Sequence, residues 1–196
     1  MTDPIRVIQY GLGPIGAATA RLIDERGNLE LVGAVDIHPG KIGRDVGEVI
    51  GLGRALGIEV AGRLGDVGRG ADVAVHTTNS YFDQFLDQVL ELLEAGLDVV
   101  STAEELSFPW RDHAEPAAIL DAAARRTGKT VLGTGVNPGF LMDSLPLFIT
   151  SIAQRVDHIA VTRVIGLDEV DEVCQTLGTA GNDEVKVLVA PGKVSS

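Results

Sequence analysis

The sequence has 196 residues, with 28 acidic side chains against 16 Lys and Arg, so its formal net charge is −12. Apolar residues make up 45% and charged residues 22%, as in an ordinary globular protein. The acidic excess argues against binding to nucleic acid and to anionic membranes, because both need clustered basic side chains. The single cysteine, Cys174, excludes an internal disulfide framework and a cysteine-based zinc site.

No apolar run reaches the roughly 18 residues that a membrane-spanning helix needs. The first residues also lack the basic and apolar regions of a signal peptide. No two histidines have the spacing of metal ligands. We therefore expect a cytoplasmic protein that acts on small molecules and holds no metal.

Short β-branched runs alternate with helix-forming segments along most of the chain, which predicts a Rossmann-type, doubly wound α/β fold with a mostly parallel sheet. We assign this domain to residues 1–155 and expect residues 156–196 to be a short remnant of a second domain. The expected strands are 5–10, 29–35, 58–60 at an edge, 71–77, 98–101, 130–133 and 158–165, with a further strand-like run at 185–189. The expected helices are 17–23, 44–50, 81–93, 112–126 and 142–154.

A glycine-rich turn joins the first strand to the first helix. Gly11, Gly13 and Gly16 form a GxGxxG pattern, and Asp36 follows twenty residues after the third glycine. In this context the pattern predicts a dinucleotide site, with the pyrophosphate at the helix N-terminus and Asp36 accepting hydrogen bonds from the adenosine ribose. The alternative is a glycine turn without a ligand. The other residues predicted to bind the cofactor in this turn are Leu12, Pro14 and Ile15.

The type of nicotinamide cofactor stays open. Asp36 repels a 2′-phosphate and so favours NAD. However, His38, Lys41 and Arg44 follow closely and could reach such a phosphate. The alternative for Lys41 and Arg44 is a solvated loop. We therefore expect NAD or NADP, with dual use possible.

Polar residues follow the strand that ends near position 77. Because ligands of open α/β sheets lie at the carboxyl ends of the strands, Thr77, Thr78 and Asn79 are expected to line the cofactor. The alternative is that Asn79 or Ser80 simply caps the next helix. His76 is expected to be a hydrogen-bonded core residue.

The next two strands also end in polar segments. Thr102, Glu104 and Glu105 follow the strand 98–101, and Asn137 follows the strand 130–133, so all are expected at the cofactor edge. A carboxylate beside a nicotinamide can act as a general base or hold an ammonium ion. Adjacent residues in a loop point differently, so we expect one of the two glutamates to face the site. The alternative is a pair of solvated loop acids.

Four segments together resemble a known family. They are 10–16, 33–36, 99–110 with its Glu-Glu-Leu-Ser motif, and 133–140. They are similar to the 2,4-diaminopentanoate dehydrogenase family, which includes the native amine dehydrogenases and is related to dihydrodipicolinate reductase. The resemblance runs from about residue 5 to about residue 165.

The resemblance implies NAD(P)-dependent oxidative deamination of a small amine or diamino acid, or in reverse the reductive amination of a ketone with ammonia. It implies that Glu104 is the catalytic carboxylate, that Asn137 and Phe140 lie beside the nicotinamide and substrate, and that the protein is a homodimer. Beyond residue 165 the resemblance ends, and we expect a truncated or minimal substrate segment. Two alternatives stay open: a catalytically silent dinucleotide-binding module, and a reductase of the dihydrodipicolinate type.

Overall fold

The computed structural model describes residues 3–68, 70–161, 164–166 and 188–190. The chain separates into two compact units, Met1–Leu145 and Pro146–Ser196.

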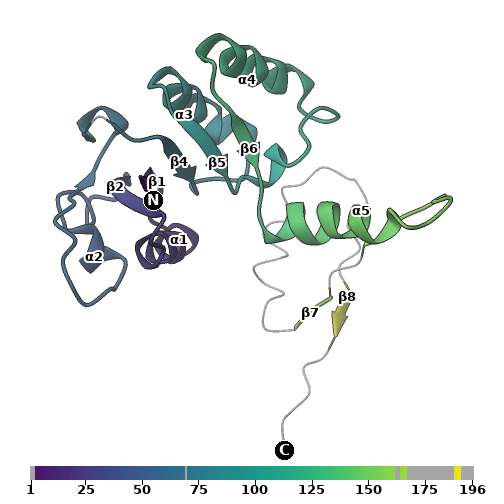
Figure 1. Cartoon of the computed structure of the whole chain (residues 1–196), viewed down its shortest axis with the longest axis horizontal. Helices are drawn as coiled ribbons and strands as arrows, with labels where there is room; N and C mark the ends of the chain where they lie inside the picture. The colour runs from purple at the N-terminus through teal and green to yellow at the C-terminus, as the bar shows by residue number, and fades with distance from the viewer. Residues whose placement is uncertain (1–2, 69, 162–163, 167–187, 191–196) are drawn as a thin grey trace, which may run out of the picture. The chain divides into compact units, whose positions relative to one another are not determined.

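The first unit is built on a six-stranded sheet in the order β3-β2-β1-β4-β5-β6, in which every neighbouring pair is parallel (Figure 1). This confirms the predicted Rossmann-type fold. The strand order reverses between β1 and β4, which is where ligands bind in open α/β sheets. The strands are β1 (Ile5–Tyr10), β2 (Leu29–Val35), β3 (Val60–Ala61), β4 (Val73–His76), β5 (Asp98–Ser101) and β6 (Val131–Gly133).

Helices cover both faces of this sheet, and each face has its own apolar core. One core joins β1 and β2 to α1 and α2 through side chains such as Val7, Ala20 and Val46. The other joins β1, β4 and β5 to α3 and α4, which lie side by side in Figure 1, with Phe85 and Leu92 fully buried. The helices are α1 (Pro14–Glu25), α2 (Val46–Val49), α3 (Phe82–Glu94) and α4 (Ala114–Thr127), with 3₁₀ turns η1 (Leu64–Asp66) and η2 (Glu104–Leu106).

Helix ends follow local chemistry. Helix α1 begins at Pro14, three residues earlier than expected, because proline is well suited to the first helical position. Helix α4 ends where Gly128 adopts φ +68°, a conformation that glycine takes without strain. The edge strand expected at 58–60 is instead the two-residue β3.

The segment after β6 differs most from expectation. The helix expected at 142–154 is an irregular helical segment η3 (Val136–Ser144) followed by α5 (Leu145–Thr150). Within η3, Asn137, Pro138 and Gly139 have non-helical backbone angles. Helix α5 ends at Thr150, and the hydroxyls of Thr150 and Ser151 donate to the carbonyls of Pro146 and Phe148.

In the second unit, the strand expected at 158–165 is also displaced. Residues 158–161 are not in a strand, whereas β7 (Val164–Gly166) pairs in parallel with β8 (Leu188–Ala190). Strand β8 overlaps the run expected at 185–189, of which residues 185–187 lie outside the described residues. Cys174 also lies outside them. No helix in the described part of the chain is long and apolar enough to cross a membrane.

Candidate functional site

The turn after β1 is shaped by its glycines. Gly11 has φ +94° and donates its N–H to the Val35 carbonyl, 2.8 Å away, at the end of β2. A side chain on Gly16 would collide with the Gly11 carbonyl oxygen, so Gly16 lets α1 begin close beneath the turn. A side chain on Gly13 would meet nothing within 4 Å, so the fold does not require glycine there. The space beside Gly13 is open to a ligand.

The N-terminus of α1 faces this space without a side-chain cap. Gly13 is the N-cap residue, and no side-chain hydrogen bond caps the helix there. Pro14 follows as the first helical residue. Uncapped N–H groups at a helix start are suited to binding a phosphate, and the helix dipole adds to the attraction. Of the other predicted residues in the turn, Pro14 and Ile15 are exposed, whereas Leu12 is buried in the core below.

A buried glutamine that the sequence motifs do not indicate lies beneath the turn. Gln9 on β1 is fully buried, and its Nε2 donates to the Gly11 carbonyl at 3.0 Å and to Thr77 Oγ1 at 2.8 Å. Thr77 Oγ1 also donates to the Gly11 carbonyl at 3.0 Å. These bonds fix the Gly11 carbonyl just beyond the paired ends of β1 and β4. The signal in the sequence was an amide side chain between Ile8 and Tyr10, in the apolar part of the strand.

Asp36 lies directly after β2, as predicted, and its carboxylate accepts three hydrogen bonds. The donors are the N–H of Leu12, the N–H of His38 and Nζ of Lys41, each 2.8 Å away. Burial raises the pKa of Asp36, but the hydrogen bonds from Lys41, His38 and Leu12 and the charge of Lys41 outweigh it, so the pKa lies below its usual value of 3.8. Asp36 is therefore an ionised acceptor at neutral pH. Lys41 contacts it directly instead of lying in a solvated loop.

The segment after β4 holds the three polar residues predicted there. Thr77 is bonded to the glycine turn, Thr78 donates to Gln88 Oε1 of α3 at 2.6 Å, and Asn79 is exposed. The alternative that Asn79 or Ser80 caps α3 is wrong. The N-cap residue is Tyr81, and its side chain makes no capping hydrogen bond to the helix.

His76 is a core residue, as expected, and it joins three elements. Its Nδ1 lies 2.9 Å from Ser101 Oγ on β5, and its Nε2 lies 2.9 Å from Gln88 Oε1 on α3 and 2.8 Å from Thr78 Oγ1. Since the amide oxygen of Gln88 can only accept, Nε2 carries the proton and Nδ1 accepts from Ser101. Burial lowers the pKa of His76, and the hydrogen bond with Gln88 opposes this only in part. His76 is thus a neutral, fixed support beneath the polar loops.

The two glutamates after β5 have different surroundings. Glu105 Oε2 accepts the N–H of Phe82 at 2.7 Å, and it lies 3.4 Å from His113 Nε2. Its carboxylate therefore caps α3, the role that the alternative interpretation gave to Asn79 or Ser80. Glu104 is exposed, and its side chain has no hydrogen bond or ion pair with any residue that the structure describes. Of the two glutamates, Glu104 is the one whose carboxylate has no partner in the described part of the chain.

Thr102, Asn137 and Phe140 lie in the loops around Glu104. Thr102 follows β5 and donates its N–H to the His76 carbonyl at 3.1 Å. Turn η2 packs against η3, so Asn137 and Phe140 belong to a segment that contacts the glutamate loop. Asn137 Oδ1 is buried without a donor among the described residues, and Phe140 is 56% exposed. The segments after β1, β2, β4, β5 and β6 thus all meet at the carboxyl edge of the sheet.

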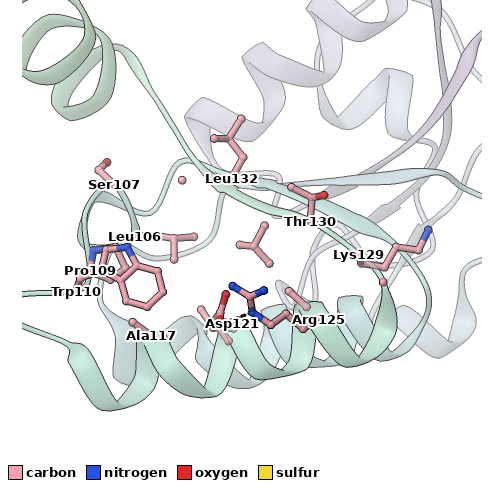
Figure 2. A pocket seen from close by; sticks show the side chains of 15 residues that line it. Leu106, Ser107, Pro109, Trp110, Ala117, Asp121, Arg125, Lys129, Thr130 and Leu132 are labelled. Carbon is pink, nitrogen blue, oxygen red and sulfur yellow. Dashed lines mark hydrogen bonds and ion pairs between the residues drawn. The ribbon is translucent and has the colours of Figure 1, made fainter. Parts of the chain in front are cut away.

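A pocket of about 500 Å³ lies elsewhere, between α4, β6 and the segment that follows η2. Figure 2 shows Trp110 and Pro109 at one end, Lys129 at the other, and Asp121 and Arg125 projecting from α4. None of the predicted site residues lines it. The carboxyl edge of the sheet remains the candidate site.

The donors and acceptors of this edge fit a dinucleotide. The α1 N-terminus offers N–H groups for a pyrophosphate, Gly13 leaves room for it, and Asp36 is an ionised acceptor for ribose hydroxyls. Among the described residues, no group of three or more His, Cys, Asp or Glu side chains is placed to hold a metal ion.

Comparison with known proteins assigns the chain to a family. Residues 5–103, about half of the chain, match the family described as "Dihydrodipicolinate reductase, N-terminus". The chain belongs to this family. The matched range contains the glycine turn, Asp36, Thr77–Asn79 and Thr102, whereas Glu104 follows immediately after it.

Matches to individual proteins extend the similarity beyond residue 103. The chain is 32% identical over 169 residues to 2,4-diaminopentanoate dehydrogenase of Acetoanaerobium sticklandii, covering 84% of this chain and 47% of the relative. It is 28% identical over 196 residues to an amine dehydrogenase of Streptomyces virginiae, covering 96% of this chain and 51% of the relative. The structure of an amine dehydrogenase from Mycobacterium smegmatis matches with a TM-score of 0.75 at 32% identity, covering 84% of this chain and 49% of that one.

These matches show homology to diaminopentanoate dehydrogenase and to amine dehydrogenases, as the sequence motifs implied. The chain spans about half the length of the curated relatives that it matches.

Proposed function

We propose that the protein is an NAD(P)-dependent amine dehydrogenase and that this chain carries its dinucleotide-binding domain. Such an enzyme interconverts a small amine or diamino acid with the corresponding ketone and ammonia. The support is the homology to enzymes with these names, together with the geometry of the carboxyl edge of the sheet.

The residues for cofactor binding come from several strand ends. The turn from Gly11 to Gly16 holds the pyrophosphate, and Asp36 accepts from the adenosine ribose. The remaining surface for NAD or NADP is provided by Thr77, Thr78, Asn79, Thr102 and Asn137. When bound, the nicotinamide supplies the hydride acceptor or donor of the reaction.

The observation that carries the catalytic assignment is the different state of the two glutamates. An amine nitrogen must lose a proton as the carbon beside it is oxidised, and a carboxylate without a competing partner can take it. Glu105 is bonded to the N–H of Phe82, whereas Glu104 is exposed and has no such partner in the described part of the chain. We therefore assign proton transfer to Glu104, with Asn137 and Phe140 lining the substrate side.

The test is oxidation of NADH and NADPH by a panel of short-chain ketones, each measured with and without ammonium. We expect turnover that requires ammonium. Glu104→Gln, which cannot transfer the proton, should lower the rate by about 100-fold or more. Glu105→Gln keeps an oxygen to accept the Phe82 N–H and should retain most of the activity.

Each other result has a definite meaning. Loss of activity in Glu105→Gln but not in Glu104→Gln would reverse the assignment of the glutamates. Ketone reduction that does not need ammonium gives the alcohol and would contradict the amine dehydrogenase proposal. Binding of NADH without any turnover would favour a silent dinucleotide-binding module.

A further inference from the structure

Lys41 lies at the point where an adenosine ribose would meet the protein. Its Nζ is 2.8 Å from Asp36 Oδ2 and 2.9 Å from the carbonyl oxygen of Leu12. The ammonium group therefore joins the glycine turn after β1 to the acid after β2. Its side chain is only 26% exposed.

The three donors to Asp36 are not equivalent. The N–H groups of Leu12 and His38 are fixed by the backbone, whereas the Lys41 ammonium is on a flexible four-carbon stem. A carboxylate has about four acceptor positions, and three are taken here. A ribose hydroxyl that donates to Asp36 must use the last position or replace Lys41. In both cases the hydroxyl lies next to the ammonium group.

Lys41 also changes the charge that a ligand meets. An unpaired Asp36 would repel a phosphate on the ribose. The ion pair with Lys41 cancels that charge, and Arg44 lies exposed three residues further on, 3.9 Å from Glu48. The end of β2 is therefore close to neutral, with one partly buried ammonium group able to turn from Asp36 to a ligand.

We propose that Lys41 is the specificity-determining residue for the 2′ substituent of the cofactor. It stays on Asp36 when the ribose carries a 2′-hydroxyl and turns to the phosphate when the ribose carries a 2′-phosphate. The chain therefore accepts both NADH and NADPH, and without Lys41 the uncompensated Asp36 selects NADH. This inference rests on the proposed dinucleotide binding and assigns it a subsite.

The test compares Lys41→Met with Lys129→Met. The second variant removes the same charge at a lysine near β6, 3.9 Å from Asp98. Dissociation constants for NADH and NADPH are measured by fluorescence of the reduced nicotinamide. We expect the wild type to bind NADH and NADPH with dissociation constants within about tenfold of each other. Lys41→Met should weaken the binding of NADPH by about tenfold or more, since a hydrogen bond to a charged group is lost. The dissociation constant for NADH should change by less than about twofold. Lys129→Met should change neither.

Lys41→Arg keeps the charge and should retain NADPH binding, which separates the role of the charge from a general loss of structure. If Lys41→Met weakens both cofactors by the same factor, Lys41 is only a tether between two loops and the inference is overturned. A wild type that binds NADH but prefers it over NADPH by more than about 100-fold also overturns it, while leaving the proposed function intact. A wild type that binds neither cofactor overturns both.

Discussion

In the turn after β1, the three glycines face different surroundings. Gly11 has φ +94°, and a side chain on it would lie 2.9 Å from the Thr77 carbonyl oxygen. Gly16 faces the Gly11 carbonyl, whereas Gly13 has extended backbone angles and no neighbour in the direction of a side chain. Folding therefore requires glycine at positions 11 and 16. The fold leaves position 13 open to a side chain, and glycine there fits the proposed close approach of a ligand to the backbone.

This difference predicts opposite effects of two alanine substitutions. Gly13→Ala should change the free energy of unfolding by less than about 0.5 kcal/mol but weaken NADH binding. Gly16→Ala should lower the free energy of unfolding by about 1–3 kcal/mol, because the new methyl group overlaps a backbone carbonyl. Urea denaturation and fluorescence titration measure the two quantities. Equal destabilisation by both variants would contradict the assignment of Gly13 to ligand approach.

At the scale of elements, one carboxylate organises the starts of two helices. Glu105 of η2 accepts from Phe82 at the start of α3 and pairs with His113, the N-cap residue of α4. The His113 ring also stacks on the Phe82 ring, with centroids 5.1 Å apart. Turn η2 is thereby fixed, and the adjacent Glu104 is held at the edge of the sheet.

Removing the Glu105 carboxylate should therefore destabilise the protein, and removing its neighbour should not. We expect Glu105→Ala to lower the free energy of unfolding by about 1 kcal/mol, the usual cost of losing a helix cap. Glu104→Ala should change it by less than about 0.5 kcal/mol, because the side chain is exposed. Both values come from urea denaturation followed by circular dichroism. A larger effect for Glu104→Ala would show that it has a structural partner.

At the scale of the whole molecule, the buried His76 predicts how stability depends on pH. The pKa of His76 is lowered from its usual 6.5 in the folded state, so the unfolded chain binds the proton more readily. The free energy of unfolding should therefore fall as the pH drops below about 6.5. The pKa of Asp36 is also lowered, but its contribution is lost only below its usual value of 3.8, so the two ranges are separate.

The measurement is urea denaturation at several pH values between 7.5 and 5, for the wild type and for His76→Gln. The wild type should lose stability on acidification across this range, and His76→Gln should lose less, whatever its stability at pH 7.5. Equal slopes for the two proteins would mean that His76 is not the group that takes up the proton.

Sequence alone determined the alternation of strands and helices, the glycine turn, the position of Asp36 and the family. These features depend on residues close together in the chain, because strand and helix periodicity and the requirement for glycine in a turn are local. Apolar spacing is a weaker guide to where an element ends, since it predicts a helix to residue 154 whereas α5 ends at Thr150.

Only the tertiary structure decided which polar groups are partners. Gln9 meets Thr77 across 68 positions of sequence, and Glu105 meets Phe82 across 23. Neighbouring glutamates look alike in the sequence, and they differ because only one reaches the start of α3 when β4 and β5 lie side by side. The sequence places side chains at a sheet edge, but their partners depend on the order in which the strands assemble.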